Sequence, residues 1–220
     1  DFYLFGGYQE YLLFFELLVF SKFFYLYKNN KSNLLFIILF LDTVLILWTK
    51  QEGFFYNIIL TLVFIFFCDK NNKTKLLFAV LVFLSMWLQI ELKNNIIGNF
   101  EFNEPIFHDG LLRYLQISEI INTFLLISKN IIISFFRYPI WILIVCIMIY
   151  TQFIYKIKIE NFVKFYFLIY FVFVYAIYFQ TNMNLVYLLP ITIDRILLQG
   201  SGFMIYPIVI LLNNIILKKK

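Results

Sequence analysis

The sequence predicts an all-α fold, a polytopic bundle of transmembrane helices that forms a single domain over residues 1–220. Two observations support this prediction. First, 63% of the residues are hydrophobic and only 14% are charged, whereas roughly a quarter of the residues in a soluble domain are charged. Second, long apolar runs recur along the whole chain between short polar connections. Because so few charges cannot cover a water-exposed surface, we expect the lipid bilayer to surround the helices.

Seven apolar runs are the expected membrane spans. They cover residues 11–27, 34–48, 54–68, 76–90, 139–155, 162–179 and 203–217. Each is somewhat shorter than the roughly 20 residues that a helix needs to cross the hydrocarbon core. Tyrosine, tryptophan, asparagine and lysine residues flank the runs and are expected to lengthen the helices.

The connections between these spans alternate in charge. Lysines mark the first, third and fifth connections and the C-terminal tail, at Lys28, Lys31, Lys70, Lys73, Lys75, Lys156, Lys158 and residues 218–220. The intervening connections carry the acidic residues. Because lysine-rich connections stay in the cytoplasm, we expect the N-terminal segment, residues 47–55, residues 91–138 and a loop at 180–202 to lie on the outer face. The C-terminus is then cytoplasmic, and a bacterial inner membrane is the expected location.

The longest connection, residues 91–138, differs from the others. Pro105 and Gly110 interrupt a polar stretch that is typical of an ordered loop. Apolar residues at nearly helical spacing follow, with Arg113 and Lys129 among the charges between them. This pattern predicts an amphipathic helix along the outer membrane interface, between spans 4 and 5. A pair of short re-entrant helices is the alternative.

Charged residues at the ends of spans are the first candidates for chemistry. Lys50 and Glu52 stand at the end of a span, where a charged pair reaches water and can simply anchor the helix. Asp194 and Arg195 place an acid and a permanent cation in an otherwise apolar loop. Arginine suits bidentate contact with phosphate, although a structural ion pair would explain the same residues.

Other polar residues are weaker candidates. Glu16 and Asp42 lie inside apolar runs, where a carboxylate is costly and usually faces a partner or a cavity. Lys22 or a neighbouring threonine is a candidate partner for both. His108 is a remote catalytic candidate, because a lone histidine in a loop is more often neither a base nor a metal ligand. The sequence shows no metal-binding spacing of histidine and cysteine, and we expect no nucleic-acid partner.

Three stretches occur in the order GYQEYLLFF, WTKQEGFFYNIIL and ITIDRILLQGSGF. Together they resemble the C-terminal part of bacterial GT-C-type membrane glycosyltransferases. This is the broad group related to dolichyl-phosphate-mannose mannosyltransferases and RgtA/B/C/D-like sugar transferases. Many members carry Gly-Tyr-x-Asp before a span, Lys-x-Glu-Gly at a span end, and Ser-x-x-Arg-Leu-Leu-x-Gln before the last helices. The matching residues here are 7–10, 50–53 and 192–199.

The sequence departs from this family pattern in several places. Glu10 replaces the usual aspartate and Thr192 the usual serine. A Trp-His pair that many relatives carry before the third motif is absent from NLVYLLPITIDR. The family's principal catalytic acid follows the first span, in a part that this sequence does not contain. The resemblance therefore implies a fragment that lacks its N-terminal part and is inactive alone.

The resemblance implies transfer of a sugar from a polyprenyl-phosphate donor to a lipid, glycan or protein acceptor on the outer face. In such a reaction an acid acts as base on the acceptor and cations stabilise the leaving phosphate. Lys50 and Arg195 would contact the donor phosphate, with Glu52 and Asp194 orienting them. Glu10 would act as an acid near the acceptor or near a divalent metal ion, the one cofactor considered. Membrane lipids are further expected partners.

Two other functional classes remain open. One is a non-catalytic subunit of a membrane complex. The other is a transporter segment that uses Glu16 and Asp42 as intramembrane ion or proton sites. A transporter predicts paired broken helices, and we expect the spans to lack such glycine or proline interruptions. Convergence of Glu10, Lys50 and Arg195 would favour the transferase, whereas scatter of these residues would favour the subunit.

Overall fold

The computed structural model describes residues 3–50, 52–68, 71–97, 117–180 and 185–218. These residues form eight α-helices and no β-strand, so the all-α prediction is confirmed. The helices are α1 (Tyr3–Asn30), α2 (Asn33–Thr49), α3 (Gly53–Phe67), α4 (Asn72–Ile97), α5 (Ile117–Arg137), α6 (Ile140–Phe153), α7 (Asn161–Gln180) and α8 (Leu185–Lys218). Four of the described helices, α4, α5, α7 and α8, are long and apolar enough to cross a membrane. Helices α2, α3 and α6 are apolar but shorter.

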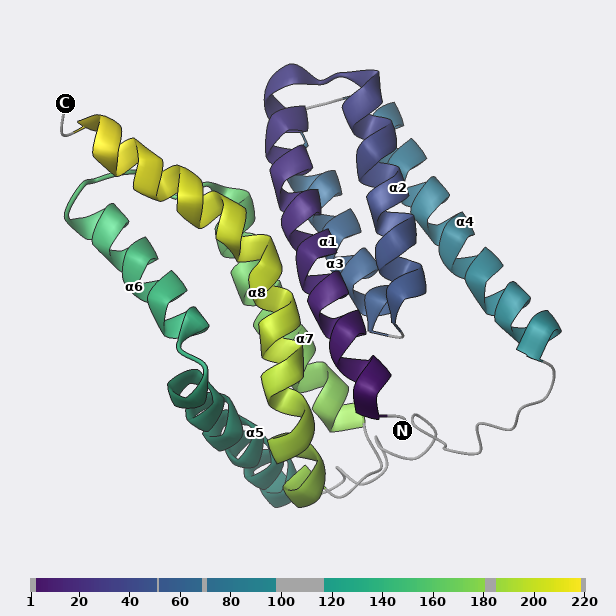
Figure 1. Cartoon of the computed structure of the whole chain (residues 1–220), viewed down its shortest axis with the longest axis vertical. Helices are drawn as coiled ribbons and strands as arrows, with labels where there is room; N and C mark the ends of the chain where they lie inside the picture. Colours follow the sequence, from purple (N-terminus) through teal and green to yellow (C-terminus); the bar gives the residue numbers. More distant parts are fainter. Residues whose placement is uncertain (1–2, 51, 69–70, 98–116, 181–184, 219–220) are drawn as a thin grey trace.

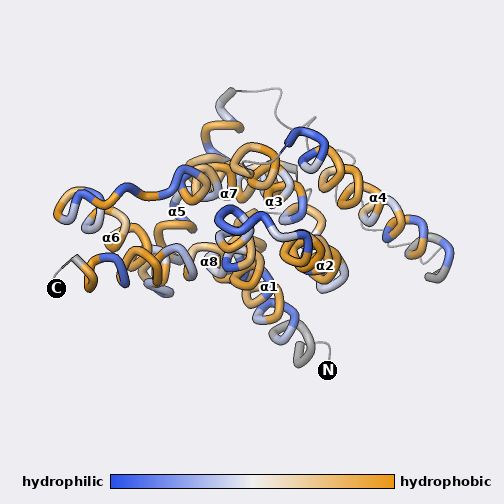
Figure 2. Tube along the Cα trace, turned by 90° about the horizontal axis from the view of Figure 1, so that it is seen from above, coloured by the Kyte–Doolittle hydropathy of each residue, from blue (hydrophilic) through white to orange (hydrophobic). Residues whose placement is uncertain are grey.

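The helices form a bundle in which α1, α2, α3 and α4 lie on one side and α5, α6 and the C-terminal part of α8 on the other (Figure 1). The α1–α2 connection, the α6–α7 connection and the C-terminus lie toward the upper end of Figure 1. The N-terminus and the α2–α3 connection lie toward the lower end. Figure 2 shows hydrophobic residues along the helices and hydrophilic residues gathered mainly near helix ends and connections. The lysine-rich α1–α2 and α6–α7 connections therefore lie at the end opposite the α2–α3 connection.

The α1–α2 connection is short because both helix ends are satisfied locally. Lys31 takes a positive φ of 50° after α1, and its N–H donates to the carbonyl of Tyr27 at 2.8 Å. The next residue, Ser32, caps α2 by accepting a hydrogen bond from the N–H of Leu34 at 3.2 Å. A left-handed residue followed by a serine cap ends one helix and starts the next.

Several helices extend beyond the predicted spans. Helix α4 continues through Glu91 to Ile97, so the long connection starts later than expected. An amphipathic helix was expected in the second half of residues 91–138, and α5 occupies Ile117–Arg137. The prediction of a loop at 180–202 is wrong, because α8 begins at Leu185 and runs without a break through this segment.

Helix α8 also contradicts the expectation that the spans lack glycine and proline. Pro190 and Pro207 lie inside the helix, as do Gly200 and Gly202. Each proline removes one backbone hydrogen bond. Side chains of neighbouring helices make extra bonds to α8 between the two prolines: Tyr170 donates to the carbonyl of Ile196 at 2.6 Å. These tertiary contacts stabilise helix where the local sequence favours a loop.

A close backbone contact joins α1 and α8, the pair of described helices with the most extensive packing. A Cβ atom added at Gly202 would overlap the backbone carbonyl of Phe14. Small residues allow such close approach between helices in membranes. Glycine at this position therefore brings the C-terminal helix against the N-terminal helix.

Candidate functional site

Four charged residues, three from the first quarter of the chain and one from its C-terminal helix, form one cluster. Lys50 Nζ lies 3.3 Å from Glu10 Oε1 and 3.1 Å from Glu52 Oε1. Arg195 Nη1 lies 3.4 Å from the same Glu10 oxygen. Glu10 thus lies between the two cations, and Lys50 lies between the two acids. We call Glu10, Lys50, Glu52 and Arg195 the charged cluster.

Each member of the charged cluster is positioned by a different local feature. Glu10 lies on α1 and is 7% exposed. Lys50 is the extended residue that ends α2, and Glu52 immediately precedes α3. Arg195 extends from α8 with 45% of its side chain exposed. The cluster therefore has a buried carboxylate at its base and a cation that reaches the surface.

The turn that carries Lys50 and Glu52 is tightened by Gly53. The N–H of Gly53 donates to the carbonyl of Lys50 at 3.0 Å. A Cβ atom at Gly53 would overlap the carbonyl oxygen of Ile46 on α2. Glycine is needed here because the backbones of α2 and α3 approach closely. This contact fixes the two charges of the turn relative to α2.

The segment of α8 that carries Arg195 is held by aromatic side chains. Trp141 Nε1 donates to the carbonyl of Leu197 at 2.8 Å, and the hydroxyl of Tyr166 donates to the carbonyl of Gly200 at 2.9 Å. Tyr170 is bonded to the adjacent Ile196 carbonyl. All three aromatic side chains are at most 1% exposed. Sequence analysis missed them, because nothing in an aromatic-rich chain distinguishes these rings from other core residues.

Asp194 does not pair with its neighbour Arg195 among the described ion pairs. Its Oδ2 atom lies 2.8 Å from Nη1 of Arg137, the last residue of α5. Successive residues of a helix point in different directions, so Asp194 and Arg195 meet different partners. The structure thus places Asp194 beside the charged cluster rather than in it. His108 lies outside the described residues.

The two carboxylates inside the apolar runs have different surroundings. Glu16 accepts a hydrogen bond from the hydroxyl of Thr49, whose oxygen lies 2.8 Å from Oε1 and 2.9 Å from Oε2. Asp42 is 5% exposed, and its Oδ2 atom has no hydrogen-bond partner among the described residues. The expectation of a threonine partner holds for Glu16. No described ion pair joins Lys22 to either carboxylate.

The charged cluster has limited room for a metal ion. Among the described residues, no three histidine, cysteine, aspartate or glutamate side chains come together in a metal-binding group. Glu10 and Glu52 both contact the ammonium group of Lys50, which lies where a shared divalent ion would bind. A metal at this position would therefore require Lys50 to move. The metal stays a prediction.

In comparisons with known proteins, no family model, no curated protein and no solved structure matches this chain. The charged cluster therefore has to be interpreted from its own geometry. Two cations from remote segments converge on one carboxylate, and the more exposed cation is an arginine. Such an arrangement suits recognition of an anion at the surface of the bundle, because a guanidinium has five N–H donors in a fixed geometry.

Proposed function

We propose that the charged cluster is part of the site of a membrane glycosyltransferase that uses a polyprenyl-phosphate-linked sugar on the outer face. The observation that carries this proposal is the convergence of Glu10, Lys50 and Arg195 through ion pairs of 3.3 and 3.4 Å. The three residues come from the three stretches with a resemblance to GT-C-type enzymes. Convergence is the arrangement expected for a shared site, whereas a structural subunit would not require it.

The proposed topology has seven crossings, with α5 lying along the outer interface. It follows from the charge alternation and from the separation of connections between the two ends of the bundle. In this arrangement the charged cluster faces outward, and the lysine-rich connections face the cytoplasm of a bacterial cell. A polyprenyl phosphate reaches the cluster laterally from the outer leaflet.

The chemistry required of the cluster is stabilisation of a leaving phosphate. Arg195 is the principal phosphate ligand, because nearly half of its side chain is exposed. Lys50, with 21% of its side chain exposed, supplies a second cation from the more buried side of the cluster. Preorganised cations that face the developing charge lower the barrier for transfer without having to reorganise.

Within this proposal Glu10 is a positioning residue rather than the catalytic acid expected from the sequence. Its carboxylate contacts both cations and is largely buried. A base must instead reach the acceptor hydroxyl. Within the proposal, Glu10 and Glu52 hold Lys50, while Asp194 fixes Arg137 nearby. The base that activates the acceptor comes from outside the charged cluster.

Binding of the carrier tests this assignment without knowledge of the sugar. The full-length protein would be photocrosslinked with a radiolabelled, photoreactive polyprenyl phosphate in membranes. We expect Arg195→Gln to reduce crosslinking strongly, and to lower any sugar transfer by roughly 100-fold, as expected when a donor to a developing charge is lost. The substitution keeps a polar side chain but shortens it and removes its charge.

Arg137→Gln is the matched control. Arg137 is also an exposed arginine at the same end of the bundle, but it pairs with Asp194 rather than with Glu10. Its substitution should change crosslinking less than about threefold, because Arg137 shares no described ion-pair partner with the charged cluster. Equal effects of the two substitutions, or unchanged crosslinking with Arg195→Gln, would refute the phosphate assignment.

One observation favours a second candidate, transport of an ion or proton. Asp42 is buried with an oxygen that has no described partner, and such a residue within an apolar helix is by default a functional candidate. The helix interruptions at Pro190 and Pro207 lie in α8, whereas Asp42 lies on α2. Ion flux into proteoliposomes that Asp42→Asn abolishes, without loss of polyprenyl phosphate binding, would favour transport.

A further inference from the structure

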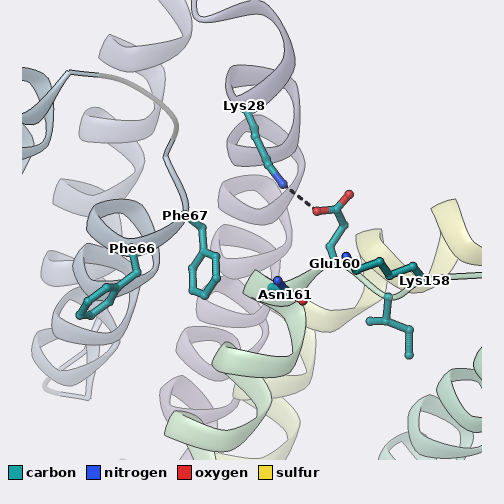
Figure 3. A pocket seen from close by; sticks show the side chains of 7 residues that line it. Lys28, Phe66, Phe67, Lys158, Glu160 and Asn161 are labelled. Atoms are coloured by element: carbon teal, nitrogen blue, oxygen red, sulfur yellow. Dashed lines mark hydrogen bonds and ion pairs between the residues drawn. The ribbon is translucent and has the colours of Figure 1, made fainter.

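We infer that the lysine-rich end of the bundle contains a binding site for a phosphate-bearing anion, occupied by the headgroup of an anionic phospholipid. The site is a cavity of about 350 Å³ at the end opposite the charged cluster. Its lining comes from Lys28 on α1, from Phe66 and Phe67 at the end of α3, and from residues 158–161 between α6 and α7 (Figure 3). We call it the lysine cavity.

The lysine cavity has more positive than negative groups. Lys28 and Lys158 contribute two cations, and Glu160 contributes one carboxylate. Lys28 Nζ lies 2.6 Å from Glu160 Oε2, whereas none of the described ion pairs includes Lys158. In Figure 3 both lysines extend toward Glu160 from different segments. Lysine ammonium groups and the Asn161 amide are donors that suit phosphate oxygens.

One wall of the lysine cavity is aromatic. The Phe66 side chain is 62% exposed, and its ring centroid lies 5.5 Å from that of Phe165 on α7. Phe67 packs against the same ring at 5.2 Å. An exposed aromatic surface beside cationic groups suits a phospholipid. The cations would contact its phosphate, and the aromatic rings would contact the adjoining glycerol and acyl chains. A free phosphate ion would contact only the polar side.

The position of the cavity along the bundle also fits a lipid headgroup. Helices α1 and α3 end beside it, and α7 begins there. The ends of apolar helices mark the depth at which headgroups lie, and basic pockets between transmembrane helices bind anionic headgroups. Further lysines near the same connections attract such lipids. They are Lys31, Lys156 and Lys164.

Lipid titration tests the lysine cavity directly. The full-length protein would be placed in phosphatidylcholine nanodiscs, and binding of a fluorescent phosphatidylglycerol would be measured. At about 1 kcal/mol, or fivefold, for each lysine, Lys28→Gln combined with Lys158→Gln should weaken binding more than tenfold. Lys73→Gln combined with Lys75→Gln removes the same charge outside the cavity and should weaken binding less than twofold.

Glu160→Gln supplies a test that does not depend on loss of function. The substitution removes the one carboxylate among the described residues that line the cavity, and it releases Lys28 from its ion pair. We expect phosphatidylglycerol to bind about fivefold more tightly, because one opposing charge is removed. A purely structural Lys28–Glu160 pair predicts no gain. An unfolding curve for each variant identifies losses that come from misfolding.

Two further measurements identify the source of the phosphate. If inorganic phosphate at millimolar concentration displaces the fluorescent lipid, and Phe66→Ala leaves lipid affinity unchanged, the anion site stands and the lipid assignment fails. Resistance to phosphate together with weaker lipid binding in Phe66→Ala supports the lipid. Equal losses in the two double lysine variants, with no gain from Glu160→Gln, overturn the inference.

Discussion

The two ends of the bundle use charge differently. At one end, Glu10 contacts Lys50 and Arg195 at 3.3 and 3.4 Å, and its side chain is 10% exposed, whereas those of the two cations are 21% and 45% exposed. At the other end, Lys28 and Glu160 are closer, at 2.6 Å, but 25% and 47% of their side chains are exposed. Burial rather than distance decides how much a pair contributes to stability, because water screens the exposed pair. The contacts of Glu10 are longer, but we expect them to contribute more to stability than the Lys28–Glu160 pair.

Removal of the carboxylate at each end should show the largest difference. We expect Glu10→Gln to lower the free energy of unfolding by about 1.5 kcal/mol, because both cations lose their most buried partner, while Lys50 keeps Glu52 and Arg195 reaches water. Glu160→Gln should cost less than about 1 kcal/mol. Unfolding in mixed detergent micelles, titrated with a denaturing detergent, measures both values.

The same pair of variants also shows what would contradict the comparison. If Glu160→Gln destabilised the protein as much as Glu10→Gln, burial would not distinguish the two ends. Raising the salt concentration sharpens the test. The small cost of Glu160→Gln should shrink further with salt, whereas that of Glu10→Gln should change little, because buried pairs are screened less.

The turns at the two ends should also respond differently to changes in side-chain size. Gly53→Ala inserts a methyl group against the carbonyl of Ile46, and we expect a loss of about 1–3 kcal/mol, as for other overpacked sites. The α2–α3 turn should shift with it, so crosslinking of polyprenyl phosphate at the charged cluster should also weaken. Unchanged stability would show that α2 and α3 separate easily.

The smallest effect is expected at the α6–α7 connection. Lys156 has a positive φ of 51°, a conformation that glycine adopts without strain. Lys156→Gly should therefore change the unfolding free energy by less than about 1 kcal/mol, in the stabilising direction. Lys156→Ala is the control, because it removes the side chain but keeps the strain, and it should give no gain. Equal stability of the two variants would contradict this explanation.

Much of the helical fold could be predicted from hydropathy, but the course of α8 could not. The apolar runs correctly indicated where α2, α3 and α6 lie. Around Asp194 and Arg195, two charges near Pro190 favoured a loop, and the structure has a continuous helix. Contacts from α6 and α7 to the α8 backbone supply the missing stabilisation, and a local pattern does not reveal contacts between distant segments.

The candidate site was predicted in part. The sequence predicted that three charged residues lie on the outer face, namely Glu10, Lys50 and Arg195. The structure brings these three residues together. The pairing of Asp194 with Arg137 was missed, because adjacent residues of opposite charge suggest a local pair. The lysine cavity was missed as well, because it forms only where α1, α3 and the α6–α7 connection meet.

Hydropathy and charge along the chain were sufficient to predict the apolar, helical character of this protein and the alternation of lysine-rich and acidic connections. Both properties are sums over neighbouring residues, so they can be evaluated without knowing which helices touch. Helix packing determines which charges share a partner, where Gly53 and Gly202 allow backbones to meet, and where the lysine cavity lies. These features depend on contacts between distant segments, which form when apolar helices pack and their charged groups must find partners.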